Sequence, residues 1–289
     1  MKKRPSSILL LLLVFIMCIP IIFVFTSSFM SFDEVRESFE MILGENVSRF
    51  IHWRIIPRNP SLRSYVAIFF DTPSFFVTFW NTIKIVIGIL VLQLLFGMPI
   101  AWGLAKLKFP CKKVILGVYI ILMILPFQVR MVSEYLVLQN LNLLDSYFAV
   151  IFPSGFSTFP VFIMYNFFKS VPDEVIEAAR IDGASDLYIF LKIAVPLGKG
   201  GIISALVLGF FEYWNILEQP MLFLEDKTLW PLSLYIPNMN LGNVHIIFSS
   251  AVLIMVPSII IFILGQEYLE QGIVKSVVEG GEYEKKKNN

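Results

Sequence analysis

The sequence carries little charge for its length. Asp, Glu, Lys and Arg together make up 16% of its 289 residues, whereas a soluble globular domain carries about 25%. The net charge of +1 gives no support for bulk attraction to nucleic acid. Apolar residues make up 57% of the chain, and the mean hydropathy is +0.76. These values exclude an ordinary soluble domain and indicate a protein that lies in membrane lipid.

Side chains that perform covalent or metal chemistry are also scarce. The two cysteines, Cys18 and Cys111, are too few for a disulfide framework or a four-ligand metal site, so we expect free thiols. The two histidines, His52 and His245, are far apart and lack metal-ligand spacing. No serine, cysteine or pair of acids forms a catalytic signature. We therefore predict a chain that is not an enzyme and binds no cofactor or metal.

Long apolar intervals recur six times, and each is of the length that a membrane-spanning helix needs. The first follows a basic cluster, but its apolar run is long and no small-residue cleavage site follows it, so we expect a retained span. We predict an all-α membrane protein with six spans, in a single domain over residues 1–278 and a disordered tail over 279–289. The spans are residues 8–29, 75–104, 114–129, 147–168, 201–217 and 245–264.

Basic residues indicate which segments face the cytoplasm, because short inner loops hold an excess of Lys and Arg. If the N-terminus lies inside, 15 of the 23 basic residues fall on inner segments and seven on outer ones, and Lys84 lies within the second span. The distribution predicts that both termini are cytoplasmic. It places loops 30–74 and 218–244 outside the membrane and residues 170–196 in the cytoplasm.

One polar stretch interrupts the hydrophobic second half, "EAARIDGASDLYIFLKIAVP" from Glu177 to Pro196. Ser170 and Asp173 have the spacing of a capping box, which predicts a helix that begins there and ends near Asp182. Gly183 then permits a sharp turn, and Ala184 to about Ala194 is amphipathic. The stretch is either a surface that a partner binds or an interfacial linker whose charges face water.

The same stretch resembles the EAA motif of the inner-membrane permeases of binding-protein-dependent ABC importers. That motif reads E-A-A, three residues, G, nine residues and I-x-L-P. The continuation through Arg-Ile-Asp-Gly-Ala-Ser is similar to the carbohydrate-uptake branch, and within it to the second permease of the maltose type. Val195 stands where the motif has leucine. The matching residues are Glu177, Ala178, Ala179, Gly183, Ile193 and Pro196.

Further matches to this family extend over most of the chain. They are "FWNTIKIVIG" at 79–88, "AWGLAKLKFP" at 101–110, "LNLLDSY" at 141–147, "FEYWNILEQPMLFL" at 211–224 and "QEYLEQGIVKS" at 266–276.

The resemblance implies the type I ABC importer permease fold in the cytoplasmic (inner) membrane. It implies that Glu177, Ala178, Ala179, Asp182 and Gly183 form a coupling surface for a cytoplasmic ATPase, and that Ile193 and Pro196 fix the exit into the membrane. The implied partners are a second, homologous permease, two ATPase subunits that use ATP-Mg, an extracytoplasmic solute-binding protein, a sugar or oligosaccharide, and membrane lipid. The outer loop 218–244 would reach into the binding protein, or would be an interfacial loop with aromatic anchors.

The chain has no motor of its own. A phosphate-binding loop needs G-x-x-x-x-G-K-[ST], and the only Gly-Lys pair, Gly198 and Lys199, is followed by Gly200. The energy for transport must therefore come from a partner.

Ionisable residues at membrane depth are costly and by default suggest a pathway or a paired site. Lys84 and Glu212 are such residues, although Lys84 is close enough to the outer end to extend its amine to the interface. The resemblance includes the Trp-Asn pair that follows Glu212, where packing or anchoring remains an alternative to sugar contact. The candidates for a translocation path are Asn81, Glu212, Trp214 and Asn215.

Other transporter classes and a membrane enzyme remain as alternatives. A permease for a polyamine or an amino acid would share the EAA motif. An ion-driven secondary carrier would usually show paired repeats with broken helices, and no convincing repeat is visible in this sequence. A membrane enzyme would need a catalytic set that the sequence lacks.

Overall fold

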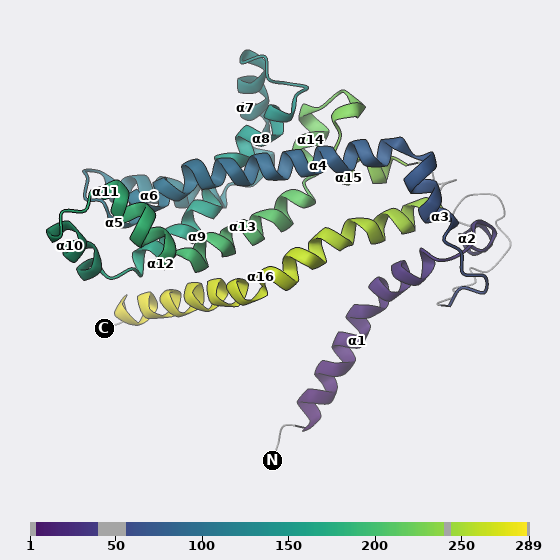
Figure 1. Ribbon diagram of the computed structural model, residues 1–289, viewed down its shortest axis with the longest axis horizontal. Coiled ribbons are helices and arrows are strands. Elements are labelled where there is room, and N and C mark those ends of the chain that lie inside the picture. The colour runs from purple at the N-terminus through teal and green to yellow at the C-terminus, as the bar shows by residue number, and fades with distance from the viewer. Residues whose placement is uncertain (1–3, 40–55, 240–243, 288–289) are drawn as a thin grey trace. The chain divides into compact units, whose positions relative to one another are not determined.

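The computed structural model describes residues 4–39, 56–239 and 244–287, and within these ranges all regular structure is helical. The predicted all-α class is confirmed. Residues 40–55 and 240–243 of the two expected outer loops lie outside the described residues. Figure 1 labels the elements: α1 (Arg4–Ser27), α2 (Phe32–Phe39), α3 (Arg63–Val66), α4 (Pro73–Leu92), α5 (Met98–Lys106), α6 (Lys112–Ile124), α7 (Phe127–Asn140), α8 (Tyr147–Gly155), α9 (Thr158–Lys169), α10 (Asp173–Ile181), α11 (Asp186–Ile189), α12 (Val195–Leu197), α13 (Lys199–Trp214), α14 (Glu218–Phe223), α15 (Leu232–Tyr235) and α16 (Val244–Lys287).

Four helical stretches are long and apolar enough to cross a membrane. Two further pairs of helices pass the same test together but are sharply bent, so the described residues hold between four and six spans. The four stretches are Leu10–Ser27, Pro73–Lys106, Tyr147–Lys169 and Val244–Leu269. The bent pairs are α6 with α7 and Asp186–Leu197 with α13.

The third predicted span is not one helix. Residues 114–129 were expected to be continuous, but α6 ends at Ile124 and α7 leaves at an angle of 104°. Pro126 has no N–H to donate, and it forces Leu125 out of the helical region to ψ 120°. The chain therefore turns at Leu125 and Pro126 instead of continuing through the span.

The last helix, α16, runs to Lys287. The disorder expected from residue 279 stays a prediction. Glu and Lys are good helix formers, and a helix that already exists adds residues without a new nucleation step.

The chain divides into two compact units, each described here by itself. The first comprises residues 1–78 and 235–259, and the second comprises residues 79–234 and 260–289. In the first unit, Ser249 donates a hydrogen bond of 3.1 Å to the carbonyl oxygen of Ser28, and Phe23 meets Phe248 edge to face. These contacts join α1 to the beginning of α16.

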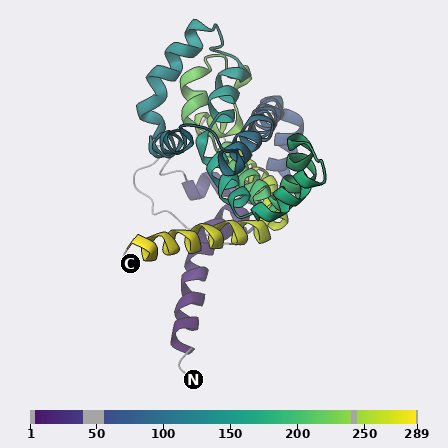
Figure 2. The same ribbon diagram turned by 90° about the vertical axis from the view of Figure 1, so that its left-hand side faces the viewer.

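The second unit is built around α9, which packs between α5 and α13. Its core includes Trp102 from α5, Phe168 from α9 and Phe190 from the π-helical turn before α12, and these rings contact one another. Figure 1 shows α10, α11 and α12 at one end of this unit and α14 and α15 toward the other end. Figure 2 views the unit from the first end, where α7 and α14 lie side by side at the top.

Glycines allow α13 to approach α9 closely. A Cβ on Gly201 would lie 2.3 Å from Cγ of Phe167, and one on Gly198 would lie 2.6 Å from Cε1 of Phe168. Small residues are the usual means of close helix contact in membranes. The two glycines therefore set the distance between α9 and α13.

Lys106, the last residue of α5, ties together the segments that flank α10. Its Nζ donates to Oδ1 of Asp173 at 2.6 Å and also to the carbonyl oxygens of Lys169 and Val171. The Lys106 side chain is only 9% exposed, whereas that of Asp173 is 75% exposed. The hydrogen bond from Lys106 and the Lys106 charge lower the pKa of Asp173. No local sequence pattern indicates this contact, because 67 residues separate the two side chains.

We predict that Gly201→Ala destabilises the protein by about 1–3 kcal/mol, because the new methyl group would overlap the Phe167 ring. The thermal unfolding midpoint in detergent would fall. Gly117→Ala is the matched control, since its Cβ would meet no atom within 4 Å, and alanine is the better helix former. Equal midpoints for Gly201→Ala and Gly117→Ala would contradict the proposed contact.

We predict that Lys106→Met increases amide hydrogen exchange in residues 171–182 by about 10- to 100-fold, because charged hydrogen bonds to two carbonyls and a carboxylate are lost. Lys108→Met, at an exposed neighbouring lysine, should leave exchange unchanged. Because the folded-state pKa of Asp173 is lowered, its share of the stabilisation is present above the ordinary Asp pKa of about 3.9 and is lost as pH falls below it. Unchanged exchange in Lys106→Met would disprove the anchoring role.

Candidate functional site

The polar stretch forms a helix, a glycine turn and a second helix, as the sequence predicted. Gly183 has φ +83°, a conformation that disfavours residues with a side chain. The N–H of Ala184 bonds to the carbonyl of Ala179, and that of Gly183 to the carbonyl of Arg180. This pair of bonds is a Schellman motif, which satisfies the last carbonyls of α10.

The capping interactions differ from the predicted ones. Ser170 does not cap α10. It is the C-cap residue of α9, and its hydroxyl donates to the carbonyl oxygen of Phe167 at 2.8 Å. Pro172 occupies the N-cap position of α10 instead. The side-chain cap is found one helix later, where Oγ of Ser185 accepts from the N–H of Tyr188. The predicted second run, from Ala184, begins as a helix at Asp186 and bends by 71° at Gly198, two residues after Pro196.

One face of α10 and α11 is buried, and the other carries exposed apolar side chains. Ile176 and Ile189 are at most 5% exposed and belong to the core of the second unit. Ile181 and Leu187 flank the glycine turn and are 86% and 67% exposed. Ala179 is packed against the core in part. The buried isoleucines therefore hold the turn against the core, and Ile181 and Leu187 form an exposed apolar surface beside it.

The charged residues of this surface are arranged around the turn. Arg180 pairs with Asp186 at 2.9 Å and so joins the two helices across Gly183. Glu177, one turn from Arg180, is exposed, and none of the described residues bonds or pairs with its carboxylate. Ala178 and Asp182 are also exposed.

The two residues expected to fix the exit of this stretch behave differently. Ile193 is half-buried against the core of the second unit, whereas Pro196 is exposed in the first turn of α12. Ile193 is therefore the one that the core holds.

Asn81, a candidate for the translocation path, is fully used by contacts within the protein. It is 2% exposed, and its amide donates to the carbonyls of Thr228 and Trp230 at 2.7 and 3.1 Å. The hydroxyl of Tyr147 donates to its Oδ1 at 2.6 Å. The side chain therefore anchors the segment after α14.

Two more side chains hold the same segment. Thr82 accepts a hydrogen bond from the N–H of Leu232, and Oδ1 of Asp145 accepts from the N–H groups of Glu225 and Asp226. Sequence reasoning quoted the segments that contain Thr82 and Asp145 but assigned neither residue a role. Long-range bonds of this kind leave no periodic signal.

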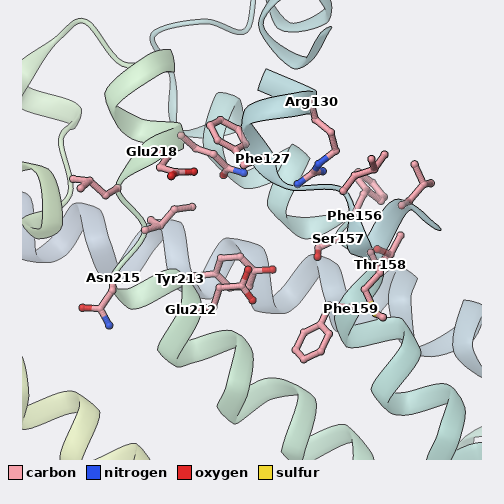
Figure 3. A pocket seen from close by; sticks show the side chains of 16 residues that line it. Phe127, Arg130, Phe156, Ser157, Thr158, Phe159, Glu212, Tyr213, Asn215 and Glu218 are labelled. Atoms are coloured by element: carbon pink, nitrogen blue, oxygen red, sulfur yellow. The ribbon is translucent and has the colours of Figure 1, made fainter. Parts of the chain in front are cut away.

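A cavity of about 700 Å³ lies beside the end of α13. It is bordered by the break between α6 and α7, the break between α8 and α9, and the beginning of α14. Figure 3 shows Glu212 and Tyr213 on one side of the cavity and Arg130 pointing toward it from α7. Arg130 was not singled out in the sequence, because its place beside this cavity depends on the bend between α6 and α7.

The structure brings two of the four translocation candidates to this cavity and leaves two elsewhere. Glu212 and Asn215 line it. Trp214 is 3% exposed and stacks on Phe210 with ring centroids 5.2 Å apart, so it is a packing residue in this structure. Lys84 places its Nζ 5.3 Å from the centre of the Tyr147 ring, a cation–π contact.

Comparison with known proteins gives a consistent family. Residues 93–275 match the family described as binding-protein-dependent transport system inner membrane component. The permease protein AraQ of the arabinooligosaccharide transport system of Bacillus subtilis is 28% identical over 275 residues, which cover 93% of this chain and 95% of AraQ. The permease protein YtcP of the polygalacturonan/rhamnogalacturonan transport system of the same organism is 31% identical over 236 residues, which cover 80% of this chain and 77% of YtcP.

Solved structures agree with these matches. One chain of a bacterial ABC transporter involved in the import of the acidic polysaccharide alginate aligns with a TM-score of 0.77 at 26% identity, covering 92% of this chain and 97% of that one. The EAA resemblance, the helical architecture and the family match over residues 93–275 agree. The chain therefore belongs to the family of binding-protein-dependent transport system inner membrane components.

Proposed function

We propose that this protein is a permease subunit of an ATP-driven importer that moves a sugar or oligosaccharide across the cytoplasmic membrane. The permeases AraQ and YtcP belong to saccharide transport systems by name, which supports a saccharide substrate here. The permease protein UgpE of an sn-glycerol-3-phosphate transport system is also similar to this chain, at 29% identity over 204 residues. A non-sugar solute is therefore the alternative.

In this proposal the chain forms one membrane domain with six spans and both termini in the cytoplasm. Each bent helix pair then counts as one span, with the bends at Pro126 and Gly198 close to a membrane surface. The turn at Gly183 faces the cytoplasm, and the segment held by Asn81 and Asp145 faces outward. The excess of Lys and Arg on the inner segments supports this orientation.

The exposed apolar surface at the glycine turn is the observation that carries the coupling role. The side chains of Ile181 and Leu187 are exposed on this polar segment, while Ile176 and Ile189 pack into the core and hold the segment there. An exposed apolar patch with a polar rim is typical of a protein contact site. The coupling surface comprises Glu177, Ala178, Ala179, Asp182 and Gly183, with Ile193 and Pro196 at its exit.

The partner at this surface is an ATPase subunit. Small side chains at Ala178 and Ala179 permit close approach, and Glu177 is free to pair with a basic group of the partner. ATP-driven closure of two such subunits would move this rigid segment and shift the bundle between inward-facing and outward-facing states. ATP-Mg binds to those subunits, and this chain holds no cofactor.

The remaining partners complete the importer. A second, homologous permease pairs with this chain, and a solute-binding protein delivers the substrate from outside. A solved bacterial alginate ABC transporter is in complex with a periplasmic protein that holds an alginate pentasaccharide; it matches this chain at 18% identity and therefore supports the fold alone. An ion-driven carrier remains the rival mechanism, and it would not need an ATPase.

We predict that Glu177→Lys lowers ATP-dependent saccharide uptake about tenfold or more, because a charge pair at the contact with the ATPase becomes a repulsion. Uptake and ATP hydrolysis would be measured in proteoliposomes that contain the whole complex, with binding protein and labelled saccharide outside. Glu267→Lys, which changes the same charge on an exposed residue of α16, is the control. Normal uptake in Glu177→Lys would count against the coupling surface.

We predict that Gly183→Pro abolishes coupling while the protein still inserts into the membrane. Proline fixes φ near −65°, whereas this position has φ +83° and its N–H bonds to Arg180. Gly183→Ala should give a milder loss, since a left-handed residue with a Cβ costs roughly 1–2 kcal/mol. The measurement is uptake per ATP hydrolysed, and a wild-type ratio in Gly183→Pro would refute the need for this turn.

A further inference from the structure

The cavity beside α13 has an unusual charge arrangement. Arg130 is the cation among the described residues that line it, and its Nη1 pairs with Oε1 of Glu134 at 3.0 Å. The positive charge of Arg130 is therefore already balanced within α7. Two further carboxyl groups, those of Glu212 and Glu218, also line the cavity.

The two lining acids differ in what holds them. Glu218 accepts a hydrogen bond of 2.7 Å from Nε2 of Gln128. The Glu212 side chain is exposed where it lines the cavity, and among the described residues none donates to its carboxyl group or forms an ion pair with it. Its carboxyl oxygens are therefore open to hydrogen bonds from a ligand or from water. Hydroxyl groups are suitable donors.

Aromatic rings supply the apolar part of the cavity. Phe127, Phe156, Phe159 and Tyr213 line it together with the acids, and Figure 3 shows their side chains around the cavity. The orientation of Tyr213 is fixed, because its hydroxyl accepts a hydrogen bond of 2.9 Å from Nε2 of the buried Gln93. Aromatic faces beside hydrogen-bonding groups suit a sugar, whose ring has apolar C–H faces and an edge of hydroxyl groups.

We propose that this cavity is a saccharide site on this chain and that it selects uncharged saccharides over acidic ones. The inference rests on the proposed transport function and adds the substrate class. Hydroxyl groups of the sugar donate to Glu212, the rings stack on the aromatic side chains, and Arg130 donates from a nitrogen that Glu134 does not use.

The charges explain the selectivity. A uronate or phosphate group would meet two lining acids and an arginine that is already paired, and like charges at short distance repel. Protonation of Glu212 would remove one repulsion but would add no positive charge. The names of similar proteins include both arabinooligosaccharides and the acidic polysaccharide alginate.

The test is direct binding to the purified complex in detergent without the solute-binding protein, so that the selectivity of that protein does not contribute. The probes are two neutral trisaccharides, arabinotriose and maltotriose, and the acidic trigalacturonate, each measured by equilibrium dialysis of the labelled sugar. We expect at least one neutral trisaccharide to bind about tenfold or more tightly than trigalacturonate. Glu212→Gln should weaken the binding of the neutral trisaccharide and reduce its affinity advantage over trigalacturonate. Glu267→Gln, at an exposed residue of α16, should change neither of these two affinities.

Equal or tighter binding of trigalacturonate would overturn the selectivity, and binding that Glu212→Gln leaves unchanged would overturn the site. Failure of both neutral probes to bind would also reject it. The transport function is judged separately by ATP-dependent uptake with the binding protein present. Uptake that persists without saccharide binding to this cavity would reject the inference alone, whereas loss of ATP-dependent uptake in the wild type would reject the proposed function.

Discussion

The close contact between α9 and α13 is the constraint on which the second unit depends. It exists because Gly198 and Gly201 leave room for the rings of Phe168 and Phe167. The bend at Gly198 directs α10 to α12 to the end of the bundle, where Ile176 and Ile189 enter the same core as α5 and α9. The glycine turn at Gly183 is thus supported by the packing of the helices beneath it.

Lys106 reinforces this support from the other side. Its amine joins the end of α9, the connecting segment and the beginning of α10, so three pieces of chain share one buried cation. The three hydrogen bonds from this amine, on a side chain that is 9% exposed, hold this segment to α5.

The polar side chains singled out above fall into two groups, those that form hydrogen bonds within the protein and those that form none with the described residues. Nδ2 of Asn81 and Oδ1 of Asp145 form hydrogen bonds with the backbone of the segment after α14. Glu177 and Glu212 have no bond or ion pair with the described residues. Both carboxyl groups are exposed, so a molecule outside the chain can donate hydrogen bonds to them.

The sequence by itself determined the helical class, the membrane location of the long apolar intervals, the helix–glycine–helix stretch and the family resemblance. These depend on local properties: apolar run length, the freedom of Gly183 to adopt positive φ, and motif spacing. Only the tertiary structure decided that Asn81 is an anchor, that Lys106 holds the beginning of α10 and that Glu212 and Arg130 face one cavity. Those features join residues roughly 70 to 150 positions apart, and such contacts leave no trace in periodicity because packing, and not local propensity, brings them together.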